Sequence, residues 1–125
     1  YREFESRVFQ HRLNLINLIR GLRADGKKIF GYGASTKGNV MLQFCGFTND
    51  DISFIAEVNE DKFGSYTPGT NIPIISEEES RKLNPDYFLI LPWHFKHGII
   101  EREKEYLSNG GKMICPMPEI EIIGG

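Results

Sequence analysis

The residue types best suited to chemistry gather in one short segment, Gly31-Tyr32-Gly33-Ala34-Ser35-Thr36-Lys37-Gly38-Asn39. It follows a strand-like stretch at 28–32 and leads into a predicted helix at 37–44, where a nucleotide-binding loop would stand. Glycine lets the backbone turn sharply, and a helix N-terminus offers free N–H groups and a partial positive charge to phosphate. The hydroxyl and ammonium side chains of the segment can add hydrogen bonds and charge. The segment therefore predicts a phosphate-bearing ligand.

The glycine spacing departs from the known phosphate-loop patterns. Gly31 and Gly33 match the first two glycines of the dinucleotide fingerprint, but Gly38 comes too late to be its third. A P-loop is excluded because no Gly-Lys-Ser/Thr occurs. Ser35 lacks the Gly-x-Ser-x-Gly context of a hydrolase nucleophile, and we predict no catalytic residue. A tight strand-to-helix turn that binds nothing is the alternative.

Two polar residues follow the next predicted strand, 52–58. Glu57 lies about 20 residues beyond the glycines, where a Rossmann site places an acidic residue for a ribose hydroxyl. A solvated carboxylate at a strand end is the alternative. Asn59 is a second candidate for a polar ligand contact.

A third candidate segment, Pro92-Trp93-His94-Phe95, follows the apolar run 87–91. If the strands 52–58, 28–32 and 87–91 lie in that order, the two loops meet at the crevice where open α/β sheets bind ligands. Trp93 can stack on a base or sugar, and His94 can donate a hydrogen bond or move a proton. A packing role for Trp93 and a structural role for His94 are the alternatives. His94 and His97 lack a third ligand, so we predict no metal site.

The periodicity of the chain indicates how these segments are positioned. A long helix is predicted over 2–24, with an apolar stripe of Phe4, Val8, Leu15, Ile19 and Leu22. Strands and helices then alternate: a capping box begins a helix at Ser76, a single helix follows Phe95, and 59–73 is a loop. This order predicts an α/β fold, a Rossmann-like three-layer sandwich whose mainly parallel sheet has four to five strands.

Composition narrows the class of protein. The 125 residues suit one domain, and the formal net charge of −2 gives no basic footprint for nucleic acid. No apolar run approaches the roughly 20 residues of a membrane span. We predict that Cys45 and Cys115 are reduced and buried, as in a cytoplasmic protein. The first residue is Tyr1, so we expect the sequence to begin inside a longer gene product.

Three segments together resemble the C-terminal domain of the SAM-dependent C-methyltransferases that act on nucleotide-linked deoxysugars. They are Gly31–Asn39, Asp61-Lys62 with Gly64–Ile74, and Leu89–Phe95, in the same order over nearly the whole chain. The resemblance implies that 1–125 is the single Rossmann-like last domain of a longer protein. A zinc-binding part and a SAM-binding catalytic domain would precede it and are absent here, so this fragment would need no cofactor of its own.

The resemblance also implies a role, which is to hold the nucleotide-linked sugar against the upstream SAM-binding domain. Two positions depart from the family pattern: His94 stands where Asn is expected, and Glu57 where Asp is more usual. The expected substrate-binding residues are Gly31, Gly33, Ala34, Ser35, Thr36, Lys37, Asn39, Glu57, Asn59, Tyr66, Trp93 and His94.

Two other functions are compatible with the residues. One is an NAD-type oxidoreductase or nucleotide-binding enzyme, although the glycine spacing and the short chain count against it. The other is an architectural domain for docking or dimerisation, in which the loop 60–74 forms an interface.

Overall fold

The computed structural model describes residues 2–124, and the side chains of residues 2–5 lie outside that description. In chain order the elements are α1 (Arg2–Ala24), β1 (Ile29–Tyr32), α2 (Thr36–Cys45), β2 (Ile55–Glu57), η1 (Glu60–Lys62), β3 (Ile74–Ser76), α3 (Glu77–Lys82), β4 (Tyr87–Ile90), η2 (Trp93–Phe95), α4 (Lys96–Arg102), α5 (Lys104–Ser108), β5 (Lys112–Cys115) and β6 (Glu121–Ile123). The elements η1 and η2 are single turns of 3-10 helix.

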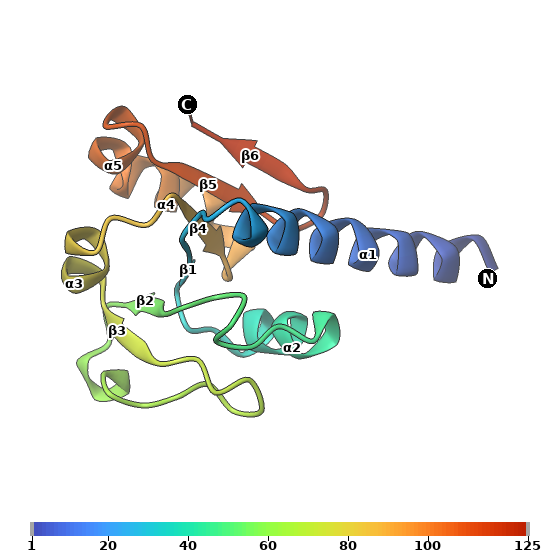
Figure 1. Cartoon of the computed structure of the whole chain (residues 1–125), viewed down its shortest axis with the longest axis horizontal. Helices are drawn as coiled ribbons and strands as arrows, with labels where there is room; N and C mark the ends of the chain where they lie inside the picture. Colours follow the sequence, from blue (N-terminus) through green and yellow to red (C-terminus); the bar gives the residue numbers. More distant parts are fainter. Residues whose placement is uncertain (1, 125) are drawn as a thin grey trace.

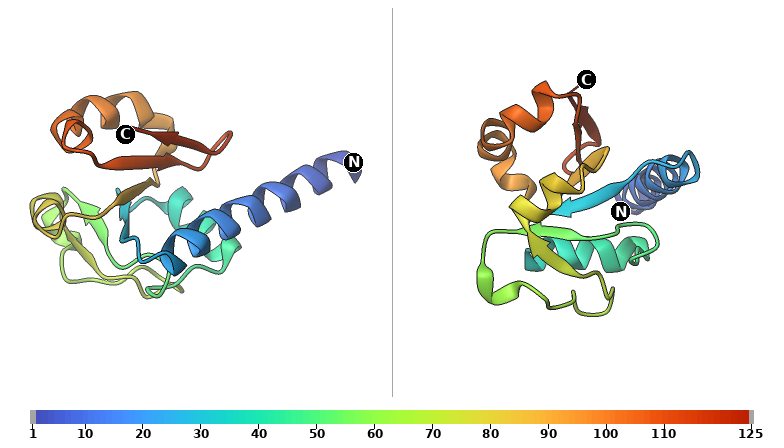
Figure 2. Two further views of the ribbon diagram at one scale, coloured as in Figure 1. Left: turned by 45° about the horizontal axis from the view of Figure 1, so that its top comes forward. Right: turned by 60° about the vertical axis from the view of Figure 1, so that its left-hand side comes forward.

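The sheet has six strands in the order β3-β2-β1-β4-β5-β6. All neighbours are parallel except β5 and β6, which pair antiparallel. The long helix α1 and the shorter α2 lie on one face of the sheet, and α3, α4 and α5 lie on the other (Figures 1 and 2). The predicted Rossmann-like three-layer arrangement is confirmed, and the sheet has one strand more than expected because β3 forms within the apolar segment after Pro73.

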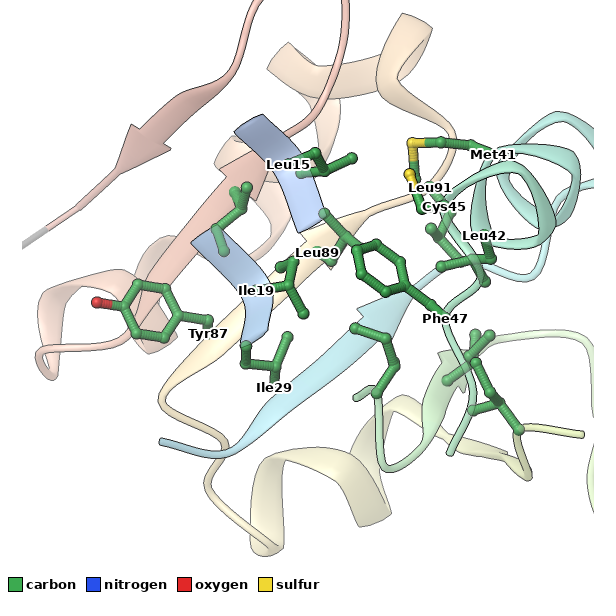
Figure 3. Packing of buried hydrophobic residues seen from close by; sticks show 14 of the residues in the cluster. Leu15, Ile19, Ile29, Met41, Leu42, Cys45, Phe47, Tyr87, Leu89 and Leu91 are labelled. Atoms are coloured by element: carbon green, nitrogen blue, oxygen red, sulfur yellow. The ribbon is translucent and has the colours of Figure 1, made fainter. Parts of the chain in front are cut away.

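Buried strands alternate their side chains between two cores. On the α1–α2 side, Leu15 and Ile19 of α1 pack with Leu89 of β4 and with residues of α2 (Figure 3). On the other side, Phe88 packs edge-to-face against Tyr32 and Tyr106. The continuous apolar run 87–91 is buried on both faces, as a central parallel strand requires.

Several sequence expectations need correction. The predicted single helix after Phe95 is two short helices, α4 and α5, because the chain breaks at Glu103, whose side chain is buried in the core. The segment 59–73 is not a plain loop, since it contains η1 and is held by its own hydrogen bonds. The stripe on α1 is buried at Leu15 and Ile19, but Val8 is exposed, and Phe4 lies outside the described side chains.

One glycine sets the distance between α2 and the sheet. A Cβ on Gly38 would lie within 3.1 Å of Leu91 Cα and closer still to Leu91 Cβ. Only a residue without a side chain lets the first turn of α2 approach the end of β4 this closely. In a Rossmann fingerprint the third glycine does this packing work. Gly38 does it here in spite of its later position.

We expect Gly38→Ala to destabilise the domain by about 1–3 kcal/mol, because backbone and not only a flexible side chain must move. Gly98→Ala is the matched control, since a Cβ at Gly98 in α4 meets nothing within 4 Å. That control should stabilise by up to about 1 kcal/mol, because alanine favours helix. Urea unfolding measures both changes. Equal effects of the two variants would contradict the close-approach explanation.

A buried ion network ties the α3–α5 layer to β1. Glu103 is 1% exposed, and its carboxylate accepts hydrogen bonds from the Tyr32 hydroxyl at 2.9 Å and from Arg81 Nε at 3.0 Å. Arg81 also pairs with Glu77, which accepts in turn from Arg102 Nε at 3.1 Å. Burial, and then the charge of Glu103, raise the pKa of Tyr32 far above its ordinary value.

The raised pKa of Tyr32 makes the stability of the folded domain depend on pH. The folded chain keeps a proton that the unfolded chain releases near pH 10, so this stabilisation is complete below about pH 10 and declines above it. Tyr32→Phe should flatten that decline and, at neutral pH, cost about 1–3 kcal/mol because Glu103 loses a donor. Tyr66→Phe, which alters an exposed ring, should leave both the alkaline decline and the stability at neutral pH unchanged. Urea unfolding between neutral pH and about pH 11 tests this, and an unchanged alkaline slope in Tyr32→Phe would contradict it.

Candidate functional site

The glycine-rich loop forms a tight turn between β1 and α2. Gly33 has φ +83°, and a Cβ there would lie 2.8 Å from Pro92 Cδ, so the residue must be glycine on both counts. Ser35 is the N-cap of α2, and its hydroxyl accepts the Gly38 N–H at 3.0 Å. The turn therefore brings the start of α2 against the chain that follows β4, as the sequence predicted for the two loops.

Glu57 holds the glycine-rich loop from the end of β2. Its Oε1 accepts the Ala34 N–H at 3.2 Å, and its Oε2 accepts the Val58 N–H at 2.9 Å. Lys62 of η1 completes a clamp: its Nζ donates to the Ala34 carbonyl at 2.9 Å and lies 3.7 Å from Glu57 Oε1. Both polar groups of the Ala34 peptide are thus used inside the protein. Lys62 belongs to a segment that carries the family resemblance, but the sequence did not predict its contact with the loop, because that contact depends on where η1 folds back.

Asn39 also makes hydrogen bonds within the domain. Its Nδ2 donates to the Pro68 carbonyl at 3.1 Å, and its Oδ1 accepts from the Thr70 hydroxyl at 3.2 Å. Gln43 adds a second donor to the same carbonyl at 2.8 Å. Thr67 and Thr70 are buried and bonded to each other through their hydroxyls. The amides of α2 therefore fix the segment 66–72 beside the loop.

Two hollows flank the glycine-rich loop at the carboxyl ends of the strands. One, of about 450 Å³, lies on the α3–α4 side and is lined by Tyr32, Gly33, Ala34, Ser35, Glu57, Val58, Glu77, Pro92, Phe95, Gly98, Ile99 and Arg102. The other, of about 330 Å³, lies at the start of α2 and is lined by Ala34, Ser35, Thr36, Asn39, Leu42, Ile55, Lys62, Ser65, Tyr66, Thr67, Pro68, Ile74 and Leu91. The switch point between β1 and β4 is thus open on both sides.

Trp93 begins η2, which is separated from β4 by Leu91 and Pro92, and it contacts both cores. Its ring stacks on the exposed His94 imidazole, with centroids 5.5 Å apart. Trp93 lines a third hollow between α1 and α2, while its neighbours Pro92 and Phe95 line the hollow beside Gly33. Phe95, the last residue of the candidate segment 92–95, is 71% exposed.

The predicted site residues therefore fall into distinct groups. Those gathered around the start of α2 are Gly33, Ala34, Ser35, Thr36, Asn39, Glu57 and Tyr66. Lys37 is exposed on α2 and, with Trp93, lines the hollow between α1 and α2. Gly31 is buried within β1, where a Cβ would press on Ile55 and Leu91, so it packs the sheet. Asn59 caps η1 through the Asp61 N–H at 3.1 Å.

Cys45 and Cys115 are free thiols, both buried, and burial raises the pKa of each. Among the described residues, no three His, Cys, Asp or Glu side chains gather as a metal site needs. None of the helices in that part of the chain combines the length and the apolar character of a membrane span.

Comparison with known proteins decides the family. A family model described as the C-methyltransferase C-terminal domain matches residues 1–118. This chain belongs to that family. The C-methyltransferase NovU of Streptomyces niveus is 44% identical over 123 residues, which are 98% of this chain and 29% of that relative. The C-methyltransferase C-terminal domain described here thus spans less than a third of its relative's length.

We expect Glu57→Ala to destabilise the domain by about 1–3 kcal/mol, because it leaves the Ala34 and Val58 N–H groups without their acceptor. The same variant should shift the amide resonances of residues 33–37. Exposed Glu60, in the adjoining η1, gives the control: Glu60→Ala should stay within about 0.5 kcal/mol of the parent protein. Urea unfolding and amide NMR measure the two effects. A Glu57→Ala protein with parental stability would show that the clamp contributes nothing.

Proposed function

We propose that this domain binds the nucleotide-linked sugar substrate of a SAM-dependent C-methyltransferase. The observation that supports it best is the glycine-rich turn at the switch point, with a hollow on either side and the start of α2 lining one of them. Ligands of open α/β sheets bind at this position. Membership of the C-methyltransferase family supports the reaction class.

The chemistry around the start of α2 suits a diphosphate. Thr36 and Lys37 are the first residues of the helix, where backbone N–H groups lack partners within the helix and the helix dipole is positive. Lys37 lies in the first turn of α2, Lys62 lines one of the two hollows, and Arg102 lines the other. Phe95, Trp93 and Tyr66 supply exposed or partly exposed rings for a base or a sugar.

An NAD-type oxidoreductase is less well supported. The Rossmann acidic residue must offer oxygen lone pairs to a ribose, but Glu57 already accepts from three backbone N–H groups and faces Lys62. It is 8% exposed. The alternative of a purely architectural domain makes a separate prediction, which is that no small ligand binds.

The proposal leaves methyl transfer to the rest of the protein. The SAM site, the catalytic base and any structural zinc would belong to domains that precede this one, and the whole protein would be cytoplasmic, where thiols stay reduced. Holding the nucleotide part of the substrate positions the reacting carbon, and such remote binding can lower a barrier by several kcal/mol. A domain without acid, base or nucleophile can therefore contribute to the rate.

Amide NMR titration with dTDP, UDP, NAD and S-adenosylmethionine tests the proposal. We expect dTDP or UDP to shift residues 33–39 and 92–95, even at millimolar affinity. Shifts from NAD alone would favour the oxidoreductase, and no shift from any of the four would favour the architectural domain.

Lys37→Ala should weaken dTDP or UDP binding about two- to fivefold, because one charge at a helix N-terminus contributes roughly 0.3–1 kcal/mol. The variant should also reduce the salt dependence of binding. Lys27→Ala is the control, since Lys27 is exposed just before β1, at the opposite end of the strand. Equal losses in the two variants would show general electrostatics and not a local contact.

A further inference from the structure

Helices α1 and α2 leave an apolar surface uncovered. Val8, Phe9 and Leu13 of α1 and Val40 and Phe44 of α2 are between 38% and 59% exposed. Val8, Val40 and Phe44 line a hollow of about 670 Å³ between the two helices, and buried Leu15, Met41 and Cys45 form its floor. We call this hollow the α1–α2 groove. Its far wall is made by Trp93 and by the turn at Met117–Glu119.

The N-terminal half of α1 is apolar on more than one side. Val8 faces the groove, while Phe9 and Leu13 follow it around the helix at 100° per residue. A surface helix of a complete domain shows one apolar stripe, and a helix with a wider apolar surface is normally covered. This half of α1 extends beyond α2 and the sheet (Figures 1 and 2). The domain's own core therefore cannot account for these side chains.

Contacts between α1 and α2 fix the spacing of the two walls of the groove. Arg12 Nε donates to the Phe44 carbonyl at 2.7 Å, and the guanidinium lies 5.3 Å from the Phe44 ring centroid. These contacts set the spacing of α1 and α2. His11 also lines the groove, and its Nε2 is buried with no hydrogen-bond partner among the described residues.

The charged residues that line the groove favour a partner surface with negative charge. Arg12 and Lys37 line it with His11, and Glu119 is the one acidic side chain among the described residues that line it. The chain as a whole carries a formal net charge of −2, so this concentration of basic side chains is local. A complementary surface is apolar at its centre and acidic at its edge, and a carboxylate there can satisfy His11.

We propose that the α1–α2 groove is the docking surface for the domain that precedes this one in the full-length methyltransferase, which presents an apolar ridge with an acidic rim. A polypeptide that precedes α1 arrives at the N-terminal end of that helix, which forms one wall of the groove (Figure 1). The matched relative has 71% of its length outside the aligned part, taking 29% from the whole, which is ample for such a domain. The groove also adjoins the candidate site through Lys37 and Trp93, so the docked domain faces that site.

Thiol labelling of the full-length protein tests this docking without any substrate, so its failure is distinct from failure of the nucleotide-binding proposal. Val40→Cys places a thiol in the groove, and Leu83→Cys places one on the other face with similar exposure in this domain. The two native thiols of this domain, Cys45 and Cys115, are buried, and a full-length protein without either introduced thiol gives the background labelling of the remaining cysteines. We expect the Val40→Cys thiol to react with a maleimide about tenfold or more slowly than the Leu83→Cys thiol, after normalisation to unfolded protein, because labelling requires domain opening.

A charge placed in the groove provides the second measurement. Val8→Asp sets a carboxylate against the acidic rim and should restore rapid labelling of Val40→Cys, whereas Ile122→Asp, also on an exposed apolar residue, should not. Three results would overturn the proposal. They are equal labelling of the two thiols, protection that disappears on dilution together with a sedimenting dimer, and protection that depends on an added nucleotide sugar. The second result would assign the groove to another copy of the chain, and the third to a ligand.

Discussion

The close approach of α2 to the end of β4 is the constraint on which the rest of the site depends. Gly38 permits it, because any Cβ would collide with Leu91 backbone and side chain. The approach in turn places Gly33 against Pro92 and so brings the two loops of the switch point together. Packing density in protein interiors leaves no slack for even one methyl group at such a contact. The geometry of the candidate site is thus a consequence of helix–sheet packing before any polar group is considered.

The polar groups of the loop are largely used to hold the loop itself. Glu57 accepts the Ala34 N–H, and Lys62 donates to the Ala34 carbonyl. Ser35 caps α2, and Asn39 donates to the Pro68 carbonyl in the segment that follows Tyr66. A loop held in this way is preorganised, so ligand binding does not include the entropic cost of ordering the loop. The groups left for a ligand are the first N–H groups of α2, exposed Lys37 and the aromatic rings around them.

The two faces of the sheet are completed differently. On the α3–α5 side, buried Glu103 is satisfied by Tyr32 and Arg81, and the edge-to-face rings close the core. On the α1–α2 side, the core under α1 is closed at Leu15 and Ile19, but the helix continues past it with its apolar residues exposed. The core on the α3–α5 side is therefore closed by residues of this domain, whereas the α1–α2 side has an exposed apolar surface suited to an interdomain contact.

The sequence by itself determined most of the order of strands and helices, because apolar periodicity, the Ser76 capping box and the glycine stops are local signals. It also located the loops that meet at the switch point, since the carboxyl ends of parallel strands share one edge. It did not show β3, η1 or the division of the helix after Phe95. Only the tertiary structure decided what the polar residues do. Glu57 turned inward to accept the Ala34 N–H, Gly38 acquired its packing role from Leu91, and the helix after Phe95 broke where Glu103 entered the core beside Tyr32. Each of these depends on residues distant in sequence, and no local pattern records such contacts.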